Sequence, residues 1–228
     1  MVDSASRAGR LPLELTRARL VFWDFDGVIK ESVDVKTRAF VSLFDWAGPE
    51  VARTVQAHHE SHGGMSRAEK IPLYLEMAGE RPTPERVAEL SERFGRAVFT
   101  QVVEAPWVPG AEQYLRTNPF AQLFALVSAT PEPELLQIVE ALNLRQVFSQ
   151  VHGAPTTKTA AVREGLNGLG IAAGDSVFVG DAKADLVAAT ANGVAFVLRE
   201  HATNRNVFPG YAGLVLTGFP SCFPDQTQ

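Results

Sequence analysis

Two aspartates, Asp24 and Asp26, directly follow the apolar run Arg19 to Trp23 in the sequence. If that run is a buried strand, the pleat and the following turn aim both carboxylates at one spot above the sheet edge. One carboxylate can then attack phosphorus, while the other donates a proton to the leaving oxygen and later takes one from water. A hard cation with oxygen ligands would relieve their mutual repulsion. A polar turn that caps a strand is the alternative.

Further polar residues follow three other segments. Asp181 and Asp185 lie four residues apart at a predicted helix start, where carboxylates also occur as ordinary helix caps. Ser128 and Ala129 offer a hydroxyl and backbone N–H groups to phosphate oxygens. Lys158 precedes a helical pattern, although a single lysine is more often exposed to solvent. Together with the first pair, these residues predict one phosphate-handling site.

The elements that position these residues form an alternating pattern of strand and helix. Four nearly continuous apolar runs predict buried parallel strands, and helical patterns lie between the later ones. Such alternation predicts a doubly wound, mainly parallel α/β sheet with ligands outside the carboxyl ends of its strands. The predicted strands span residues 19–23, 123–127, 176–179 and 194–198.

About a hundred residues separate the first predicted strand from the second, which is too long for one crossover. Apolar residues at helical spacing fill most of this gap, in segments 35–46, 49–59, 66–78 and 84–103. We therefore predict an α-helical cap domain over residues 33–104, inserted into a core domain of residues 17–32 and 105–228. The hinges are expected near Glu31-Ser32 and Ala105-Pro106.

Composition narrows the class of protein. The chain has 228 residues, 46% of them apolar, and a net charge of -5, which fits a globular protein and argues against nucleic acid as a partner. The single cysteine, Cys222, excludes an internal disulfide and favours a cytoplasmic location. No run approaches the roughly 18 apolar residues of a membrane span. The sequence leaves the oligomeric state open.

Both ends of the chain also carry expectations. The first fifteen or so residues are rich in charge and predict a solvated arm. The segment 209–228 contains Phe219 and Phe223, with Phe208 just before it. These aromatic side chains would pack either on the sheet or on a partner subunit.

The ordered motifs resemble the haloacid dehalogenase superfamily, whose signature is DxD, a strand-end Ser or Thr, a Lys, and GDxxxD. The helical insertion resembles its phosphoglycolate phosphatase-like subgroup, which has a Rossmann-like core. This resemblance implies a phosphatase in which Asp24 becomes an aspartyl phosphate and Asp26 is the general acid/base. It also implies that Ser128, Ala129 and Lys158 bind phosphoryl oxygens. Magnesium would be held by Asp24, the main-chain carbonyl of Asp26, and Asp181, supported by Asp185.

Single residues argue for or against other activities of the superfamily. Asp26 argues against carbon–halogen cleavage, because that reaction needs no proton donor. Phosphonate hydrolases of this type use a cap lysine as a Schiff base, which Lys36 or Lys70 would supply. Phosphosugar mutases of the β-phosphoglucomutase kind share all the core motifs and differ in how the cap shields the aspartyl phosphate. A non-catalytic phosphate sensor is a further alternative.

The predicted cap contains the segment His58 to Lys70, with a glycine pair between two helical patterns. It resembles the HGGxSRxEK stretch of members found in sugar-nucleotide and cell-surface carbohydrate pathways. We therefore expect His62, Gly64, Ser66 and Arg67 to contact the leaving group of a sugar or sugar-acid phosphate. A capping serine, a surface arginine and interface histidines are the alternative.

Overall fold

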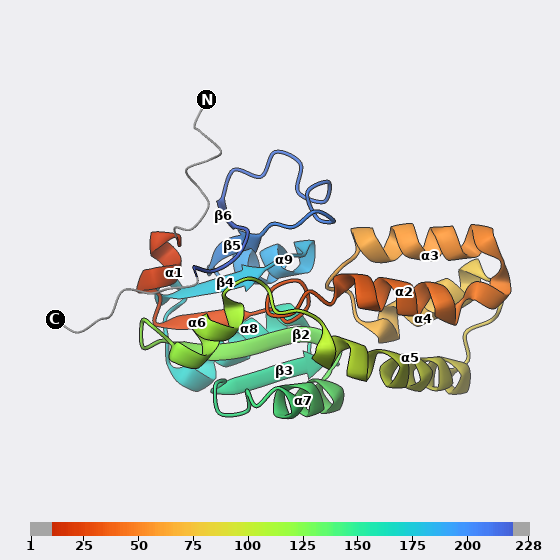
Figure 1. Ribbon diagram of the computed structural model, residues 1–228, viewed down its shortest axis with the longest axis horizontal. Helices are drawn as coiled ribbons and strands as arrows, with labels where there is room; N and C mark the ends of the chain where they lie inside the picture. Colours follow the sequence, from red (N-terminus) through yellow and green to blue (C-terminus); the bar gives the residue numbers. More distant parts are fainter. Residues whose placement is uncertain (1–10, 221–228) are drawn as a thin grey trace.

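The computed structural model describes residues 11–220 and contains a six-stranded sheet (Figure 1). The strands are ordered β3-β2-β1-β4-β5-β6, and every neighbouring pair is parallel. The central strands β1, β2 and β4 consist largely of buried apolar residues. The predicted parallel α/β sheet is therefore confirmed. The strands are β1 (Leu20–Trp23), β2 (Leu123–Pro131), β3 (Gln150–Ala154), β4 (Ser176–Gly180), β5 (Ala195–Arg199) and β6 (Leu214–Leu216).

Helices cover both faces of the sheet, as the alternation of apolar side chains in β1 requires. Val21 and Trp23 pack with helices α1, α6 and α7, whereas Leu20 and Phe22 pack with α8 and α9. The sheet is therefore doubly wound. These helices span Leu13–Arg17 (α1), Ala111–Thr117 (α6), Glu132–Ala141 (α7), Lys158–Leu169 (α8) and Lys183–Ala191 (α9), with a short 3-10 helix η3 at Ala173–Asp175.

Helices α2 to α5 lie beyond the carboxyl end of the sheet as a separate layer (Figure 1). They pack around Phe40, which contacts the rings of Tyr74 and Phe94 at centroid distances of 5.5 and 4.1 Å. The predicted helical segments 35–46, 49–59, 66–78 and 84–103 correspond to them closely. Their bounds are Val33–Leu43 (α2), Pro49–Ser61 (α3), Arg67–Met77 (α4) and Pro84–Glu104 (α5), with the 3-10 helix η2 at Asp45–Ala47.

The two chain segments that join this helical layer to the sheet lie side by side. Glu31 donates its backbone N–H to the carbonyl of Pro106 at 2.8 Å. Arg199, which ends β5, pairs with the carboxylate of Glu31 through both terminal nitrogens. Lys30 Nζ donates to the carbonyl of Val103 at 2.9 Å. These contacts hold the two connecting segments to each other and to the end of β5.

Both ends of the described chain pack on the core. The expected solvated arm is wrong for its last residues, because Leu13–Arg17 form α1 and Leu15 is fully buried. Phe208 and Tyr211 pack with the apolar cluster on the α8 and α9 face. Phe219 packs on Trp23 at a centroid distance of 5.2 Å, so these aromatic side chains lie on the sheet. Phe223 and Cys222 lie outside the described residues.

Among the helices formed by residues 11–220, none has both the length and the apolar character needed to span a membrane.

Candidate active site

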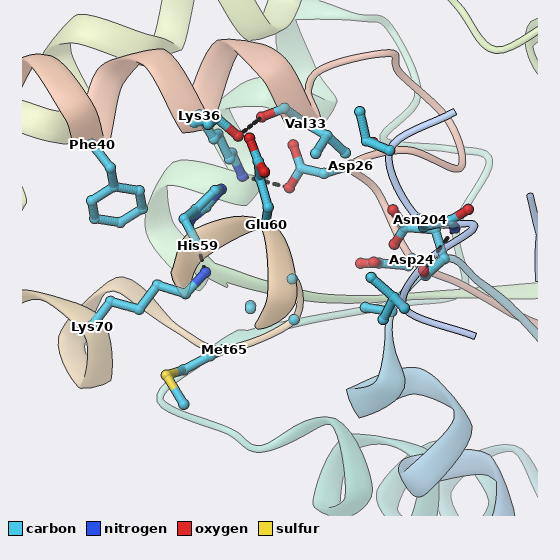
Figure 2. Close-up of a pocket in the computed structure, with 18 of the residues that line it drawn as sticks. Asp24, Asp26, Val33, Lys36, Phe40, His59, Glu60, Met65, Lys70 and Asn204 are labelled. Atoms are coloured by element: carbon cyan, nitrogen blue, oxygen red, sulfur yellow. Dashed lines mark hydrogen bonds and ion pairs between the residues drawn. The ribbon is translucent and has the colours of Figure 1, made fainter. Parts of the chain in front are cut away.

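Asp24 and Asp26 leave the carboxyl end of β1 in different directions. Asp24 is 5% exposed and donates its backbone N–H to Val179 of β4 at 3.0 Å. Asp26 points toward α2, where its carboxylate accepts hydrogen bonds from Ser32 Oγ at 2.6 Å and Lys36 Nζ at 2.5 Å (Figure 2). Asp24 is therefore fixed to the sheet, whereas Asp26 is tied to the first helix of the helical layer.

Lys158 joins the two acidic motifs. It is the first residue of α8, which Thr157 caps, and its Nζ lies 2.9 Å from Asp24 Oδ2 and 2.6 Å from Asp185 Oδ1. Asp185 is fully buried, and its other oxygen accepts from the backbone N–H groups of Asp181 and Ala182 at 3.2 and 3.0 Å. The carboxyl ends of β1 and β4 and the start of α8 thus bring together residues far apart in the sequence.

Burial dominates the electrostatics of this cluster. Burial, followed by repulsion from Asp185, raises the pKa of Asp24 to about 7, although Lys158 opposes the shift. Burial also raises the pKa values of Asp181 and Asp185. For Lys158, burial favours the neutral amine, but the ion pairs with Asp185 and Asp24 outweigh it and raise its pKa. The carboxylates therefore crowd negative charge that one lysine only partly balances.

This cluster fits a hard divalent cation such as Mg²⁺. One carboxylate oxygen from each of Asp24, Asp181 and Asp185 can be chosen so that all three lie within 4.8 Å of one another. Oxygen-only donors suit such a cation, and its charge would offset the burial and the mutual repulsion that raise the pKa values of these aspartates. The Asp26 side chain is outside this group. The sequence predicted that Asp26 would bind the metal through its main-chain carbonyl. The three side-chain carboxylates leave that prediction untested.

Ser128, Ala129 and Thr130 lie near the end of β2, beside β1. Ser128 is buried, and its Oγ accepts a hydrogen bond from the Thr130 backbone N–H at 3.1 Å. Ala129 and Thr130 line the cavity described below, and Thr130 Oγ1 accepts from Lys36 Nζ at 2.7 Å. The strand-end segment therefore lies at the same edge of the sheet as Asp24 and Lys158.

A cavity of about 100 Å³ separates the core residues from helices α2 to α5. Asp24, Asp26, Lys158 and Asp181 line its core side. Figure 2 shows Asp24 and Asp26 at this cavity. The opposite side comes from the helical layer. Its lining residues there include Lys36, Phe40, His59, Gly63, Gly64, Met65, Arg67, Lys70 and Phe94.

The four residues expected to contact substrate from the cap occupy different positions. Gly64 lines the cavity, and a Cβ there would meet Ala184 Cβ at 2.6 Å, so the loop lies directly on the start of α9. Ser66 caps α4 in a reciprocal arrangement with Glu69, and neither Ser66 nor His62 lines this cavity. Both line an adjoining cleft of about 880 Å³ between the loop and the core.

Arg67 lines the cavity, but its guanidinium is already paired. Its Nη2 donates to both carboxylate oxygens of Glu134 on α7, at 2.7 and 2.6 Å. Its Nη1 donates to the carbonyl of Ser91, and the guanidinium carbon lies 4.7 Å from the Phe94 ring centroid. Arg67 therefore connects the helical layer to the sheet domain.

Sequence reasoning missed two residues of the site. His201 Nε2 lies 2.9 Å from Asp181 Oδ2, and Thr203 Oγ1 lies 2.8 Å from the other ring nitrogen. Asn204 donates to the main-chain carbonyls of Asp181 and Arg199, both at 2.9 Å. Both residues follow β5, and a polar run after the last predicted strand was the one signal that could have indicated them.

Comparisons with known proteins agree with this arrangement. The family model of haloacid dehalogenase-like hydrolases matches residues 21–198. A phosphoglycolate phosphatase of Pectobacterium atrosepticum is 28% identical over 196 residues, which cover 79% of each chain.

Solved structures share the fold at lower identity. A point mutant of CbbY from Rhodobacter sphaeroides, in complex with xylulose-(1,5)bisphosphate, has a TM-score of 0.69 at 19% identity, covering 89% of this chain and 95% of that one. A predicted phosphoglycolate phosphatase from Haemophilus somnus has a TM-score of 0.67 at 16% identity, with the same coverage.

The match to the family model spans β1 to β5, including Asp24, Lys158, Asp181 and Asp185. The chain therefore belongs to the haloacid dehalogenase-like hydrolase family, as its motifs predicted. It is an enzyme of the hydrolase class.

Proposed function

We propose that this protein is a magnesium-dependent phosphatase that hydrolyses a small phosphorylated metabolite, a sugar or sugar-acid phosphate, through an aspartyl phosphate. The main support for this proposal is that Lys158 Nζ contacts both Asp24, at 2.9 Å, and Asp185, at 2.6 Å. This contact holds a cation beside the proposed nucleophile, where a phosphoryl oxygen would need it.

In the first step, Asp24 attacks phosphorus, and the bond between phosphorus and the ester oxygen breaks. Lys158 and the strand-end segment Ser128-Ala129 bind phosphoryl oxygens, because both lie at the edge of the sheet where Asp24 projects. Attack requires ionised Asp24. The ion pair with Lys158 favours that form against the burial that raises the pKa of Asp24.

Asp26 serves as the general acid and base. It delivers a proton to the leaving oxygen and in the second step takes a proton from the water that attacks the aspartyl phosphate. Lys36 Nζ, 2.5 Å from Asp26 Oδ2, holds this carboxylate in place from the helical layer. Ser32 Oγ fixes the other carboxylate oxygen at 2.6 Å.

The metal would be held by Asp24, Asp181 and the main-chain carbonyl of Asp26, with Asp185 supporting the site. When bound, Mg²⁺ supplies positive charge that lowers the repulsion between the phosphoryl group and the aspartates. His201 and Asn204 orient Asp181 through its carboxylate and its carbonyl, respectively. Such supporting contacts commonly tune metal affinity.

The substrate class follows from the cavity and its lining. The polar residues that the helical layer contributes to the cavity suit a leaving group that carries hydroxyl or anionic groups. The names of the relatives, a phosphoglycolate phosphatase and a protein in complex with xylulose-(1,5)bisphosphate, support a small phosphorylated substrate. We take residues 33–104 as the cap domain that closes over it. The single cysteine of the sequence fits a cytoplasmic location.

Phosphate release from a panel of sugar, sugar-acid, nucleotide and short-chain phosphates tests this function. We expect turnover with magnesium and its loss on chelation. Conversion of a sugar phosphate to its positional isomer without phosphate release would instead identify a mutase.

A further inference from the structure

Lys70 is a buried lysine that lies across the cavity from Asp24, the proposed nucleophile. It lies on α4, is 2% exposed and lines the same cavity as Asp24 and Asp26. Figure 2 shows Lys70 and His59 on one side of this cavity and Asp24 on the other. The function proposed above assigns no role to Lys70.

Three other basic side chains that line this cavity already pair with carboxylates. Lys36 pairs with Asp26, Lys158 with Asp24 and Asp185, and Arg67 with Glu134. Within residues 11–220, Lys70 forms no ion pair with a carboxylate. Its one hydrogen-bond partner in that range is His59 Nδ1, at 2.9 Å. An ammonium group has three N–H donors, so two of them have no acceptor in the described part of the chain.

The surroundings of Lys70 keep it without a counterion. The Phe40 ring centroid lies 5.7 Å from Nζ, and Phe40 in turn lies 4.9 Å from the His59 ring. Burial and the neighbouring Lys70 lower the pKa of His59 to about 2, so its imidazole is neutral and its Nδ1 is an acceptor. A buried cation with an uncharged partner is costly unless an anion from outside the protein joins it.

We propose that Lys70, held by His59, binds a second anionic group of the substrate, a carboxylate or a second phosphate, while the first phosphate lies against Asp24 and Lys158. This inference rests on the proposed function and narrows its substrate class to phosphate esters with a negatively charged tail. An incoming anion accepts the unused N–H donors and supplies the missing counterion. Hydrogen bonds of this charge-assisted kind are shorter and stronger than neutral ones.

The test compares esters that differ in the charge of the tail. Suitable pairs are phosphoglycolate with 2-hydroxyethyl phosphate, 3-phosphoglycerate with glycerol 3-phosphate, and glucose 1,6-bisphosphate with glucose 6-phosphate. Each pair is assayed with the native protein and with Lys70→Met. Arg96→Met is the matched control, because it removes an exposed cation of α5 that lines neither the cavity nor the adjoining cleft.

We expect Lys70→Met to raise the KM of the anionic member of a pair by roughly 10- to 100-fold, as the loss of a charge-assisted hydrogen bond implies. The KM of the neutral member should change less than about threefold, and Arg96→Met should change neither. For each pair, the rise in KM of the anionic member is divided by that of the neutral member. If this ratio is larger for the carboxylate esters than for the bisphosphate, the subsite binds a carboxylate, and the reverse indicates a phosphate. Equal losses for both members of every pair would overturn the proposal.

Binding to an inactive background separates this inference from the proposed function. Calorimetry with Asp24→Asn and with the double variant Asp24→Asn, Lys70→Met measures affinity without turnover. If the native protein releases phosphate from none of the esters, the proposed function fails, but weaker binding of the anionic ester to the double variant still supports the subsite. Equal binding of that ester to both variants overturns the subsite even if the native protein is an active phosphatase.

A covalent use of Lys70 is the competing outcome. An uncharged amine can condense with a substrate carbonyl to an imine, with loss of one water, and borohydride reduces the resulting C=N bond. Native protein is therefore incubated with phosphonoacetaldehyde and borohydride, and its peptides are analysed by mass spectrometry. A reduced adduct on Lys70 together with cleavage of the carbon–phosphorus bond overturns the anion subsite. Absence of any adduct is the expected result.

Discussion

Arg67 on α4 and Glu134 on α7 form a two-point contact, with hydrogen bonds of 2.7 and 2.6 Å, between the helical layer and the sheet domain. Both side chains are largely buried, at 6% and 15% exposure. Charge-assisted pairs in such surroundings are strong and geometrically specific. This contact therefore holds the proposed cap against the core in the arrangement that encloses the cavity.

Glu134→Gln should loosen that contact. The amide keeps the size of the side chain but not its charge, and we expect kcat/KM to fall by roughly tenfold, which corresponds to about 1.4 kcal/mol. Hydrogen exchange in the connecting segments near Glu31 and Pro106 should become faster. Glu92→Gln, which breaks the exposed pair with Arg96 on α5, is the control and should leave both quantities unchanged. Unchanged exchange and kinetics in Glu134→Gln would exclude a role for this contact in closure.

Gly27 is predicted to be essential for the position of Asp181. Its φ is +73°, and a Cβ there would lie 2.3 Å from Asp181 Oδ2. Gly27→Ala should therefore weaken Mg²⁺ binding by at least about tenfold, because it displaces a proposed ligand. Gly79→Ala is a matched control, since Gly79 has a φ of +75° with no atom within 4 Å of the added Cβ. Both variants should lose roughly 1–2 kcal/mol of stability, because alanine is strained at a positive φ. Calorimetric titration measures the affinity of each variant for Mg²⁺. Equal Mg²⁺ affinities in Gly27→Ala and Gly79→Ala would refute the prediction.

Lys36 is predicted to support proton transfer by Asp26. Lys36→Met removes the Nζ that lies 2.5 Å from Asp26 Oδ2 and 2.7 Å from Thr130 Oγ1. We expect kcat for an alkyl phosphate to fall by about 100-fold, within the usual range for general acid–base catalysis. An aryl phosphate, whose leaving group needs little protonation, should lose less than about tenfold. Similar losses for both esters would show that Lys36 acts on binding or folding instead.

Lys70 should make the stability of the protein depend on pH. Burial, followed by repulsion from Lys36, lowers its pKa from 10.5 to about 7. Between pH 7 and 10.5 the unfolded chain holds more protons at this lysine than the folded protein, so its contribution to stability rises with pH in that window. Below pH 7 both states are protonated, and the full destabilisation remains. The charged or titratable groups that face it are His59, Lys36, Glu69, Asp26 and Lys158.

Lys70→Met should consequently be more stable than the native protein at pH 7, by an amount on the order of a few kcal/mol. The advantage should shrink as the pH approaches about 9.5. Urea unfolding of both proteins at about pH 6.5, 8 and 9.5 measures this difference. A constant difference across these pH values, or a less stable variant, would contradict the assigned cause.

Much of the fold could be predicted because its central strands are buried on both faces. β1, β2 and β4 are apolar runs that are recognisable in the sequence, and the motifs after them identify the ends that bear the site. β3 and β6 were missed for a physical reason. β3 contains Gln150 and His152 and is mostly half-buried, whereas β6 has three residues at the sheet edge. Neither gives the apolar signal of a central strand.

Side-chain partners were harder to predict, because they depend on contacts between distant segments. Lys158 followed a loop in the sequence and could have been exposed, but Asp24 and Asp185 bury it. Arg67 was expected to contact substrate, and its position in the cavity keeps that prediction open, while its pairing with Glu134 required knowing that α4 and α7 meet. Ser66 serves as a helix cap, which was the alternative to a contact with substrate.

The proposed mechanism requires that Asp24 accept the phosphoryl group. Rapid acid quenching of the native protein during turnover of its best ester, followed by mass spectrometry of the peptides, tests it most directly. We expect one phosphoryl group on Asp24 in the presence of magnesium, and no phosphorylated peptide and no phosphate release in Asp24→Asn. Phosphate release by Asp24→Asn at the native rate, or a phosphoryl group on a different residue, would contradict it.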